Sequence, residues 1–277
     1  MYKKSIKIAT IIAASSLIYA CGGDQKETTN EEVVITEEVV IEEETEQIDY
    51  VLPSPLQIAE LFKRAGLTYI GDVTNSPESV DNYNTKYDQK LNYGVYSADM
   101  AYCIMNNQTQ ESIDYLATLS KLSEKLWMTD IMGSMGLTDR LEANVGNEDS
   151  LTYIMADLQM QMDDYLDENG MGYTGSIIFA GAWIETLYLG TKVNENEKNE
   201  KLIGRLSEQA VILESLIASI KQHDTENEYA ELITDLEGLN TTFTGYAESE
   251  EDFMLNDEAV KTLGEQIKTL RAKIVGA

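Results

Sequence analysis

Prolines are confined to the first part of this 277-residue chain, where all three lie before residue 78. Proline breaks helices, so the remainder is free to form long ones. Apolar residues recur there at intervals of three and four, which is the spacing of one helix face, as in Leu263, Ile267, Leu270 and Ile274. No strand-like alternation bounded by hairpin turns occurs. The pattern predicts an all-α domain, an antiparallel multi-helix bundle or helical-hairpin array of about seven to nine helices.

Capping residues indicate where the first helices begin and end. Ser54 followed by Pro55 starts one helix, and Gly66 ends it. Ser76 followed by Pro77 repeats the start signal, and the apolar stripe after it predicts a helix as far as Asn106. The next helices should start at the caps Thr109 and Asn147.

The second half of the domain contains its most apolar stretch. Residues 169–175 hold three glycines and are expected to form a long connection. Residues 176–193 are apolar on all sides, which predicts a central, buried helix. Three more helices are expected over residues 196–222, 226–247 and 256–275.

The amino terminus resembles a secretory signal. Three lysines precede residue 8, and residues 8–20 are apolar or small. A helix of this length would cover only about 20 Å, short of the roughly 30 Å hydrocarbon core of a membrane. Residues 1–20 are therefore predicted to be a cleaved signal peptide rather than a membrane span.

Ile18, Tyr19, Ala20 and Cys21 follow one another at the end of that apolar run. They resemble the lipobox of bacterial lipoprotein precursors, which implies that Cys21 becomes the first mature residue and carries lipid. The acidic start after Cys21 is similar to that of uncharacterised Bacteroidota envelope lipoproteins. The resemblance implies an outer-membrane anchor, with the chain on the periplasmic or cell-surface face. The alternative is cleavage after Ala20 by signal peptidase I, which leaves a free thiol.

The segment after Cys21 predicts a spacer. Residues 31–36 and 37–42 form an acidic near-repeat, and like charges extend a chain. The predicted organisation is a signal peptide over residues 1–20, a lipidated and acidic tether over 21–52, and a helical domain over 53–277. Possible halves of that domain are residues 53–146 and 147–277.

The formal net charge of −29 excludes some partners. A chain this acidic repels nucleic acid, whose recognition needs Lys and Arg against phosphate. It also repels anionic lipid head groups, so membrane attachment must come from the lipid on Cys21. The simplest interpretation of the acidity is solubility.

Motifs for catalysis or metal binding are missing. The single histidine, His223, cannot supply the histidine pairs of zinc hydrolases or di-iron bundles, and suits a helix end instead. Residues 163–170 resemble a calcium loop, but Tyr165 and Ser176 stand where an EF-hand needs Asp and Glu. Cys103 is expected in the core. We therefore expect no enzyme, no cofactor and no metal site.

Two carboxylates stand out because they lie inside apolar helical stretches. Residues 94–102 and 180–188 can be aligned as a weak internal repeat, in which Asp99 matches Glu185. Each has a tyrosine three residues later, Tyr102 and Tyr188. A buried carboxylate needs a partner, or its pKa rises. We expect a hydrogen bond to tyrosine or backbone, or exposure on the outer face. The competing hypothesis is a ligand pocket with walls formed by Tyr96, Tyr102, Trp183 and Tyr188.

Two functions follow from these observations. The first is a membrane-anchored envelope lipoprotein whose helical domain binds or scaffolds another envelope protein without catalysing a reaction. The alternative is a lipoprotein that binds a small molecule or cation near Asp99 and Glu185.

Overall fold

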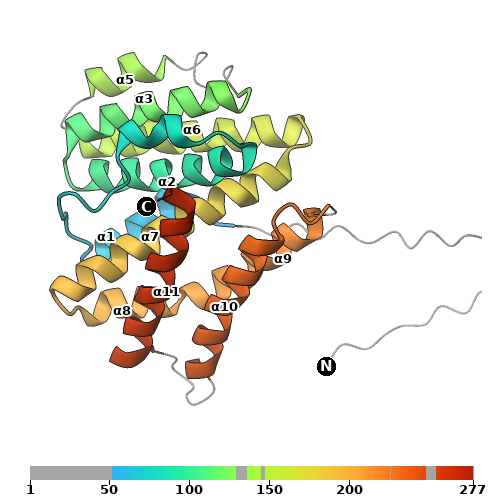
Figure 1. Ribbon diagram of the computed structural model, residues 1–277. Coiled ribbons are helices and arrows are strands. Elements are labelled where there is room, and N and C mark those ends of the chain that lie inside the picture. The colour runs from blue at the N-terminus through green and yellow to red at the C-terminus, as the bar shows by residue number, and fades with distance from the viewer. Residues whose placement is uncertain (1–51, 129–135, 145–146, 225, 248–253, 277) are drawn as a thin grey trace, which may run out of the picture. The chain divides into compact units, whose positions relative to one another are not determined.

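The computed structural model describes residues 52–128, 136–144, 147–224, 226–247 and 254–276 (Figure 1). The predicted signal peptide, Cys21 and the tether up to residue 51 lie outside the described residues. The described part belongs to one compact unit that begins at Glu46 and ends at Ala277.

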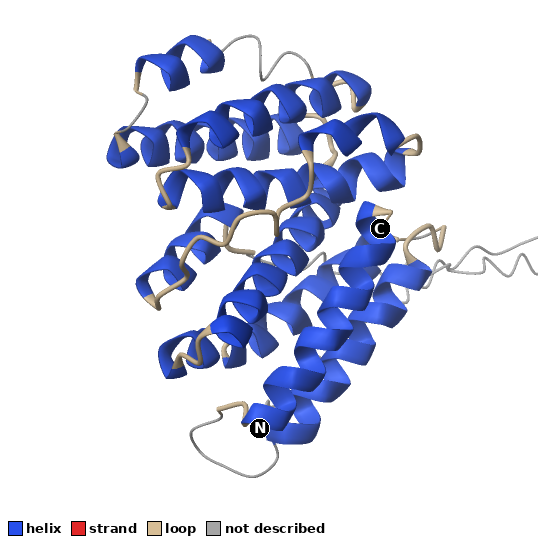
Figure 2. Cartoon of the chain, turned by 60° about the vertical axis from the view of Figure 1, so that its left-hand side comes forward, coloured by secondary structure: helices blue, strands red, loops and turns tan. Residues whose placement is uncertain are grey.

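The described residues form helices and the loops between them, and no strand occurs among them (Figure 2). The elements are α1 (Pro55–Arg64), the 3₁₀ helix η1 (Pro77–Asn82), α2 (Lys86–Met105), α3 (Thr109–Lys125), α5 (Leu137–Ala143), α6 (Glu148–Glu168), α7 (Gly172–Asn196), α8 (Glu200–Ser207), α9 (Gln209–His223), α10 (Ala230–Ala247) and α11 (Asp257–Val275). The all-α prediction is confirmed.

Ser76 caps a helix as predicted, but that helix is short. The Ser76 hydroxyl accepts a hydrogen bond from the Glu78 amide at 3.3 Å, and the chain forms a 3₁₀ helix. Tyr83 then adopts an extended backbone, with φ −84° and ψ 102°, which ends that helix. α2 begins separately, with Thr85 as its cap. The prediction of one continuous helix from Pro77 was therefore wrong.

Three further boundaries differ from the predictions. Thr109 is the first residue of α3 rather than its cap, and Gln108 precedes it without a capping side-chain bond. α7 already begins at Gly172, so the glycine-rich connection is shorter than expected. One helix was expected over residues 196–222, but Glu208 separates α8 from α9 there. Asn147 and Asn256 cap α6 and α11 through their side chains.

The centre of the fold is the crossing of α2 and α7. Gly94 on α2 lies so close to α7 that an added Cβ would overlap the carbonyl oxygen of Ile178. Gly181 on α7 lies equally close to the carbonyl oxygen of Leu91. Glycine is needed at both positions because the two backbones touch. Trp183 and most neighbouring residues of α7 are buried, which confirms the prediction of a central helix.

Buried side chains form two clusters on either side of this crossing. One cluster joins α2 to α3, α5 and α6, and the other joins α7 to α8, α9, α10 and α11. α1 contributes to both, through Leu56 and Phe62 respectively. α6 packs with the first cluster, although it lies in the predicted second half. Cys103 is buried in the first cluster, as expected.

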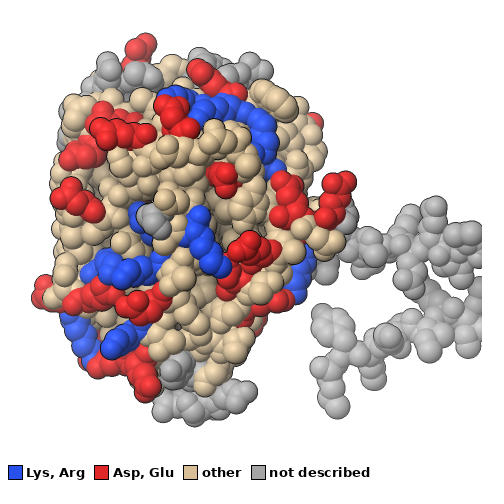
Figure 3. Space-filling model, viewed as in Figure 1, with Lys and Arg blue, Asp and Glu red and all other residues tan. Residues whose placement is uncertain are grey.

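No described helix is both long enough and apolar enough to cross a membrane. On the face drawn in Figure 3, Lys and Arg side chains alternate with Asp and Glu. Despite the negative net charge, this face is therefore not a uniformly acidic surface.

Candidate functional site

Asp99 and Glu185 meet where α2 crosses α7. Both side chains are fully buried, with a relative exposure of 0%. Exposure on the outer face, one of the expected arrangements, is therefore excluded, whereas the expected backbone hydrogen bond is present at Asp99. They are held there because the glycine contacts bring α2 and α7 together one to two turns away.

Arg271 of α11 neutralises Glu185. Its Nε donates to Glu185 Oε2 at 2.6 Å, and its Nη2 donates to Glu185 Oε1 at 2.9 Å. Nη2 also donates to the Val73 carbonyl at 3.2 Å, and the guanidinium lies 4.2 Å from the ring centre of Tyr188. Burial lowers the pKa of Arg271, but the Glu185 carboxylate more than offsets this and raises it. A two-bond pair of this kind is among the strongest hydrogen-bonded arrangements in proteins.

Within the buried pair, the surroundings favour a proton on Asp99 over one on Glu185. Burial and the nearby Glu185 carboxylate raise the pKa of Asp99 well above its usual range. Burial also raises the pKa of Glu185, but Arg271 and a hydrogen bond with Asp99 oppose this rise. Asp99 Oδ2 accepts from the Asn75 amide at 3.0 Å, whereas Oδ1 has no donor. A protonated Asp99 can donate to the neighbouring Glu185 carboxylate.

The tyrosines around the acids hold the connection between α1 and η1. Tyr102 donates to the Thr68 carbonyl and accepts from the Ile70 amide, both at 2.7 Å. Tyr96 donates to the Ser76 carbonyl at 2.8 Å, and Tyr115 donates to the Asn75 carbonyl at 3.0 Å. Backbone groups that are shielded from water need such partners. The tyrosines therefore fasten this loop to the core.

The expected bonds between each acid and the tyrosine three residues later are replaced by others. Tyr102 bonds to the loop instead of Asp99, and Tyr188 stacks on Arg271 instead of bonding to Glu185. Trp183 donates its Nε1 hydrogen to Gln209 Oε1 at 3.0 Å. Asp99, Tyr102, Trp183 and Glu185 are all buried, and Tyr188 is partly exposed. Ligand binding there would require displacement of Arg271.

Arg271 and Asn75 are the members of this cluster that the sequence interpretation missed. Arg271 is four residues after Ile267 and three before Ile274, so it lies on the apolar stripe of α11. A cation within such a stripe indicates a buried acidic partner, and that signal was present. Asn75 takes part through its backbone amide, which no sequence pattern reveals.

Open space lies elsewhere, beside α6. A cavity of about 400 Å³, which we call the α6/α7 cavity, is bounded by α1, α2, α6 and the start of α7. An open groove of about 640 Å³, the α1/α6 groove, adjoins it. Both are lined in part by Leu52, Leu56, Gln159 and Asp163, so the two spaces are neighbours.

Within the described residues, no three His, Cys, Asp or Glu side chains gather closely enough to hold a metal ion. Comparison of the chain with protein-family models, curated proteins and solved structures finds no match.

Proposed function

We propose that this chain is a lipoprotein of the bacterial outer membrane, anchored through lipid on Cys21, whose helical domain binds another envelope protein without catalysing a reaction. The lipobox-like residues before Cys21 support the anchor. The Asp99 and Glu185 cluster supports the absence of catalysis, because its groups are paired and buried.

The observation that carries the binding proposal is the α1/α6 groove. Tyr153 and Met160 line it and stay exposed, at 70% and 58% of their full surface. They are seven residues apart on α6 and therefore lie on one face of the helix. Large apolar side chains gathered around a concave surface are typical of protein-binding sites.

The charge of the groove favours a basic partner. Its charged lining residues are all acidic, namely Glu60, Asp149, Asp163 and Asp164. Complementary charge speeds association and selects partners. The partner we propose presents apolar side chains to Tyr153 and Met160, with Lys or Arg around them. Leu52, where the tether joins the domain, also lines the groove. The groove therefore lies at the point where the domain is attached to its anchor.

The alternative function, ligand binding at Asp99 and Glu185, has less support. Arg271 already occupies the position that a cationic ligand would take beside Glu185. The aromatic residues expected as pocket walls hold the α1–η1 connection or pack in the core.

Site-specific photocrosslinking in intact cells tests the proposal. A photoreactive residue replaces Met160 in one version and Val211 of α9, which is 71% exposed, in the control. We expect one defined protein to crosslink at position 160 and not at position 211. The product should decrease in the Cys21→Ser chain, and the crosslinked protein should present a basic surface. Equal products at both positions, or no product at position 160, would overturn the proposal.

A further inference from the structure

The α6/α7 cavity has the size of a small-ligand site. Its volume of about 400 Å³ falls within the range of about 300–1,000 Å³ in which proteins hold small molecules. Four separate elements enclose it, with Leu52 and Pro53 lining it beside the start of α1. The α1/α6 groove is the more open of the two spaces, so the two suit different occupants.

The walls of the cavity are largely apolar. They are formed by Leu56 of α1, by Met155, Leu158, Met162 and Leu166 of α6, and by Ile178 and Phe179 of α7. All of these side chains are buried. Methionine side chains are flexible and polarisable, so Met155 and Met162 can adapt to ligands of different shape. This part of the cavity suits a hydrocarbon body.

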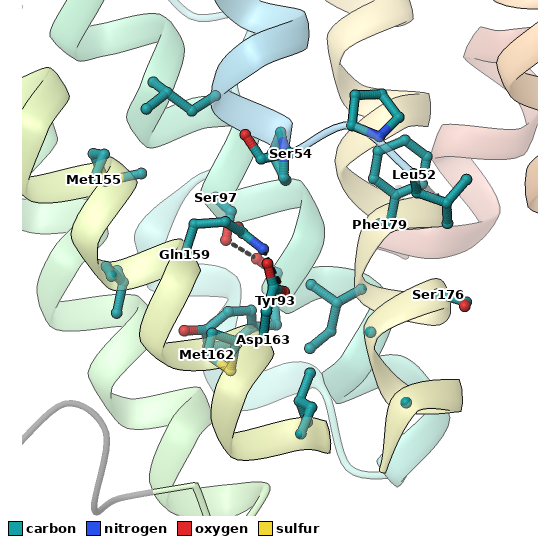
Figure 4. A pocket seen from close by; sticks show the side chains of 18 of the residues that line it. Leu52, Ser54, Tyr93, Ser97, Met155, Gln159, Met162, Asp163, Ser176 and Phe179 are labelled. Carbon is teal, nitrogen blue, oxygen red and sulfur yellow. Dashed lines mark hydrogen bonds between the residues drawn. The ribbon is translucent and has the colours of Figure 1, made fainter. Parts of the chain in front are cut away.

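The polar side of the cavity carries negative charge. Gln159 donates to Asp163 Oδ1 at 2.9 Å, and both side chains project from α6 toward the space beside α7 (Figure 4). Leu52 and Phe179 lie across from them in the same view. Among the described residues that line the cavity, only Asp163 and Asp167 are charged, and none is Lys or Arg.

Asp163 lies at the mouth, where it remains exposed. Surrounding protein nonetheless raises the pKa of its carboxyl, with smaller contributions from Asp167 and Asp164. A cationic group at the mouth would reverse that shift by stabilising the carboxylate. An anionic group there would add to the repulsion.

We propose that the α6/α7 cavity binds a small apolar molecule that carries a protonated amine at one end. The aliphatic body lies between α6 and α7, against Met155, Met162 and Phe179. The amine lies at the mouth and donates to Asp163. This cavity shares Asp163 with the protein-binding groove, but Phe179 and Met162 line the cavity alone and Tyr153 and Met160 line the groove alone, so either proposal can fail without the other.

A series of probes with one chain and three head groups tests the ligand class. Decylamine, decanol and decanoate share a hydrocarbon body and differ only in charge, and the amine is protonated at neutral pH as lysine is. The unanchored Cys21→Ser chain is titrated with each probe, and binding is followed by native mass spectrometry and thermal melting. We expect one decylamine per chain and a raised melting temperature, weaker binding of decanol, and no binding of decanoate. Equal binding of decylamine and decanoate would overturn the proposal, as would no binding of decylamine.

Paired variants locate the bound probe. Asp163→Asn should weaken decylamine roughly fivefold, the upper end for an exposed ion pair, and should leave decanol unchanged. Asp164→Asn is the matched control, because Asp164 is adjacent and exposed but lines only the groove. Equal effects of the two variants would show that decylamine responds to overall charge and not to this site.

A third variant fills the cavity. Gly175 lines it, and an added Cβ there would meet only Leu166 Cδ1, at an ordinary contact distance of 3.5 Å. Gly175→Leu should therefore fold and abolish binding of both decylamine and decanol, with thermal melting as the check on folding. Undiminished binding in a folded Gly175→Leu chain would place the probe elsewhere and contradict the proposal.

Discussion

Arg271 holds Glu185 through two hydrogen bonds, at 2.6 Å and 2.9 Å, although the two residues lie 86 positions apart. The same guanidinium bonds to the Val73 carbonyl. One side chain, that of Arg271, therefore joins α7, α11 and the α1–η1 connection. α2 joins the same cluster through the interaction of Asp99 with Glu185. Each of these contacts has a consequence that can be measured.

Removing the charge of Glu185 should destabilise the fold. Glu185→Gln leaves the largely buried Arg271 without its counterion, and breaking a buried ion pair in this way costs about 3–5 kcal/mol. The double variant Glu185→Gln/Arg271→Met should recover much of this loss, because no charge then remains unpaired. Urea unfolding of the two variants checks both expectations. A neutral effect of Glu185→Gln would show that the pair contributes little.

Asp99→Asn should make stability depend less on pH. Burial and Glu185 raise the pKa of Asp99, so the folded chain keeps a proton that the unfolded chain releases above about pH 3.9. The stabilisation from this proton is complete below that pH and is lost as the pH rises through the raised pKa. Asn is neutral throughout and can donate to Glu185 as the acid does.

The measurement is the melting temperature between about pH 5 and about pH 8. The wild-type chain should lose more stability over this interval than Asp99→Asn, which should be the more stable of the two at the upper end. Asp164→Asn removes an exposed carboxylate and serves as the control. Parallel pH curves for wild type and Asp99→Asn would mean that Asp99 is ionised in the folded chain.

Substitution of the crossing glycines should be costly. Gly94→Ala and Gly181→Ala each place a methyl group against the backbone of the opposite helix, and forced overpacking costs about 1–3 kcal/mol or more. Gly238→Ala in α10 is the control, because nothing lies within 4 Å of its added Cβ. That change should stabilise the chain by about 0.5–1 kcal/mol, since alanine favours helices. Similar melting temperatures for all three variants would contradict a backbone contact between α2 and α7.

Cys103 should be chemically inert in the folded chain. It is buried on α2, and burial raises the pKa of its thiol, so little thiolate forms. In the Cys21→Ser chain, labelling by a thiol reagent should therefore require unfolding and should accelerate in urea. A cysteine placed at exposed Val211 should react at once and provides the reference rate. Rapid labelling of Cys103 without denaturant would indicate local opening of α2.

The helices could be predicted from sequence because the signals that specify them are local. Ser54 and Asn147 cap helices where the pattern placed them, and the stripe from Leu263 to Ile274 forms one buried face of α11. The prediction of a long helix after Ser76 was wrong although the Ser76 cap forms. The helix ends at Tyr83, whose hydroxyl accepts a hydrogen bond from the Asn75 side chain. A contact of that kind depends on tertiary structure, which the local pattern does not contain.

The candidate site could be predicted only in part. Asp99 and Glu185 were identified because carboxylates inside apolar stretches are unusual, and the structure brings them together. The pairing with Arg271 was missed, because only tyrosine and backbone groups were considered as partners for the two acids. The groove beside Tyr153 and Met160 requires α1 and α6 to pack together, and nothing in either segment alone indicates this.

Partner recovery from a groove variant tests the proposed function most directly. Intact cells carrying the tagged chain are crosslinked, and recovered proteins are quantified for wild type, Tyr153→Ser/Met160→Ser and the control Val211→Ser. All three substituted residues are exposed, so folding should be unaffected. We predict one stoichiometric partner with a basic surface, retained by the control and reduced at least about tenfold by the groove variant. Undiminished recovery of that partner with the groove variant, or recovery of the chain alone in every case, would contradict the account.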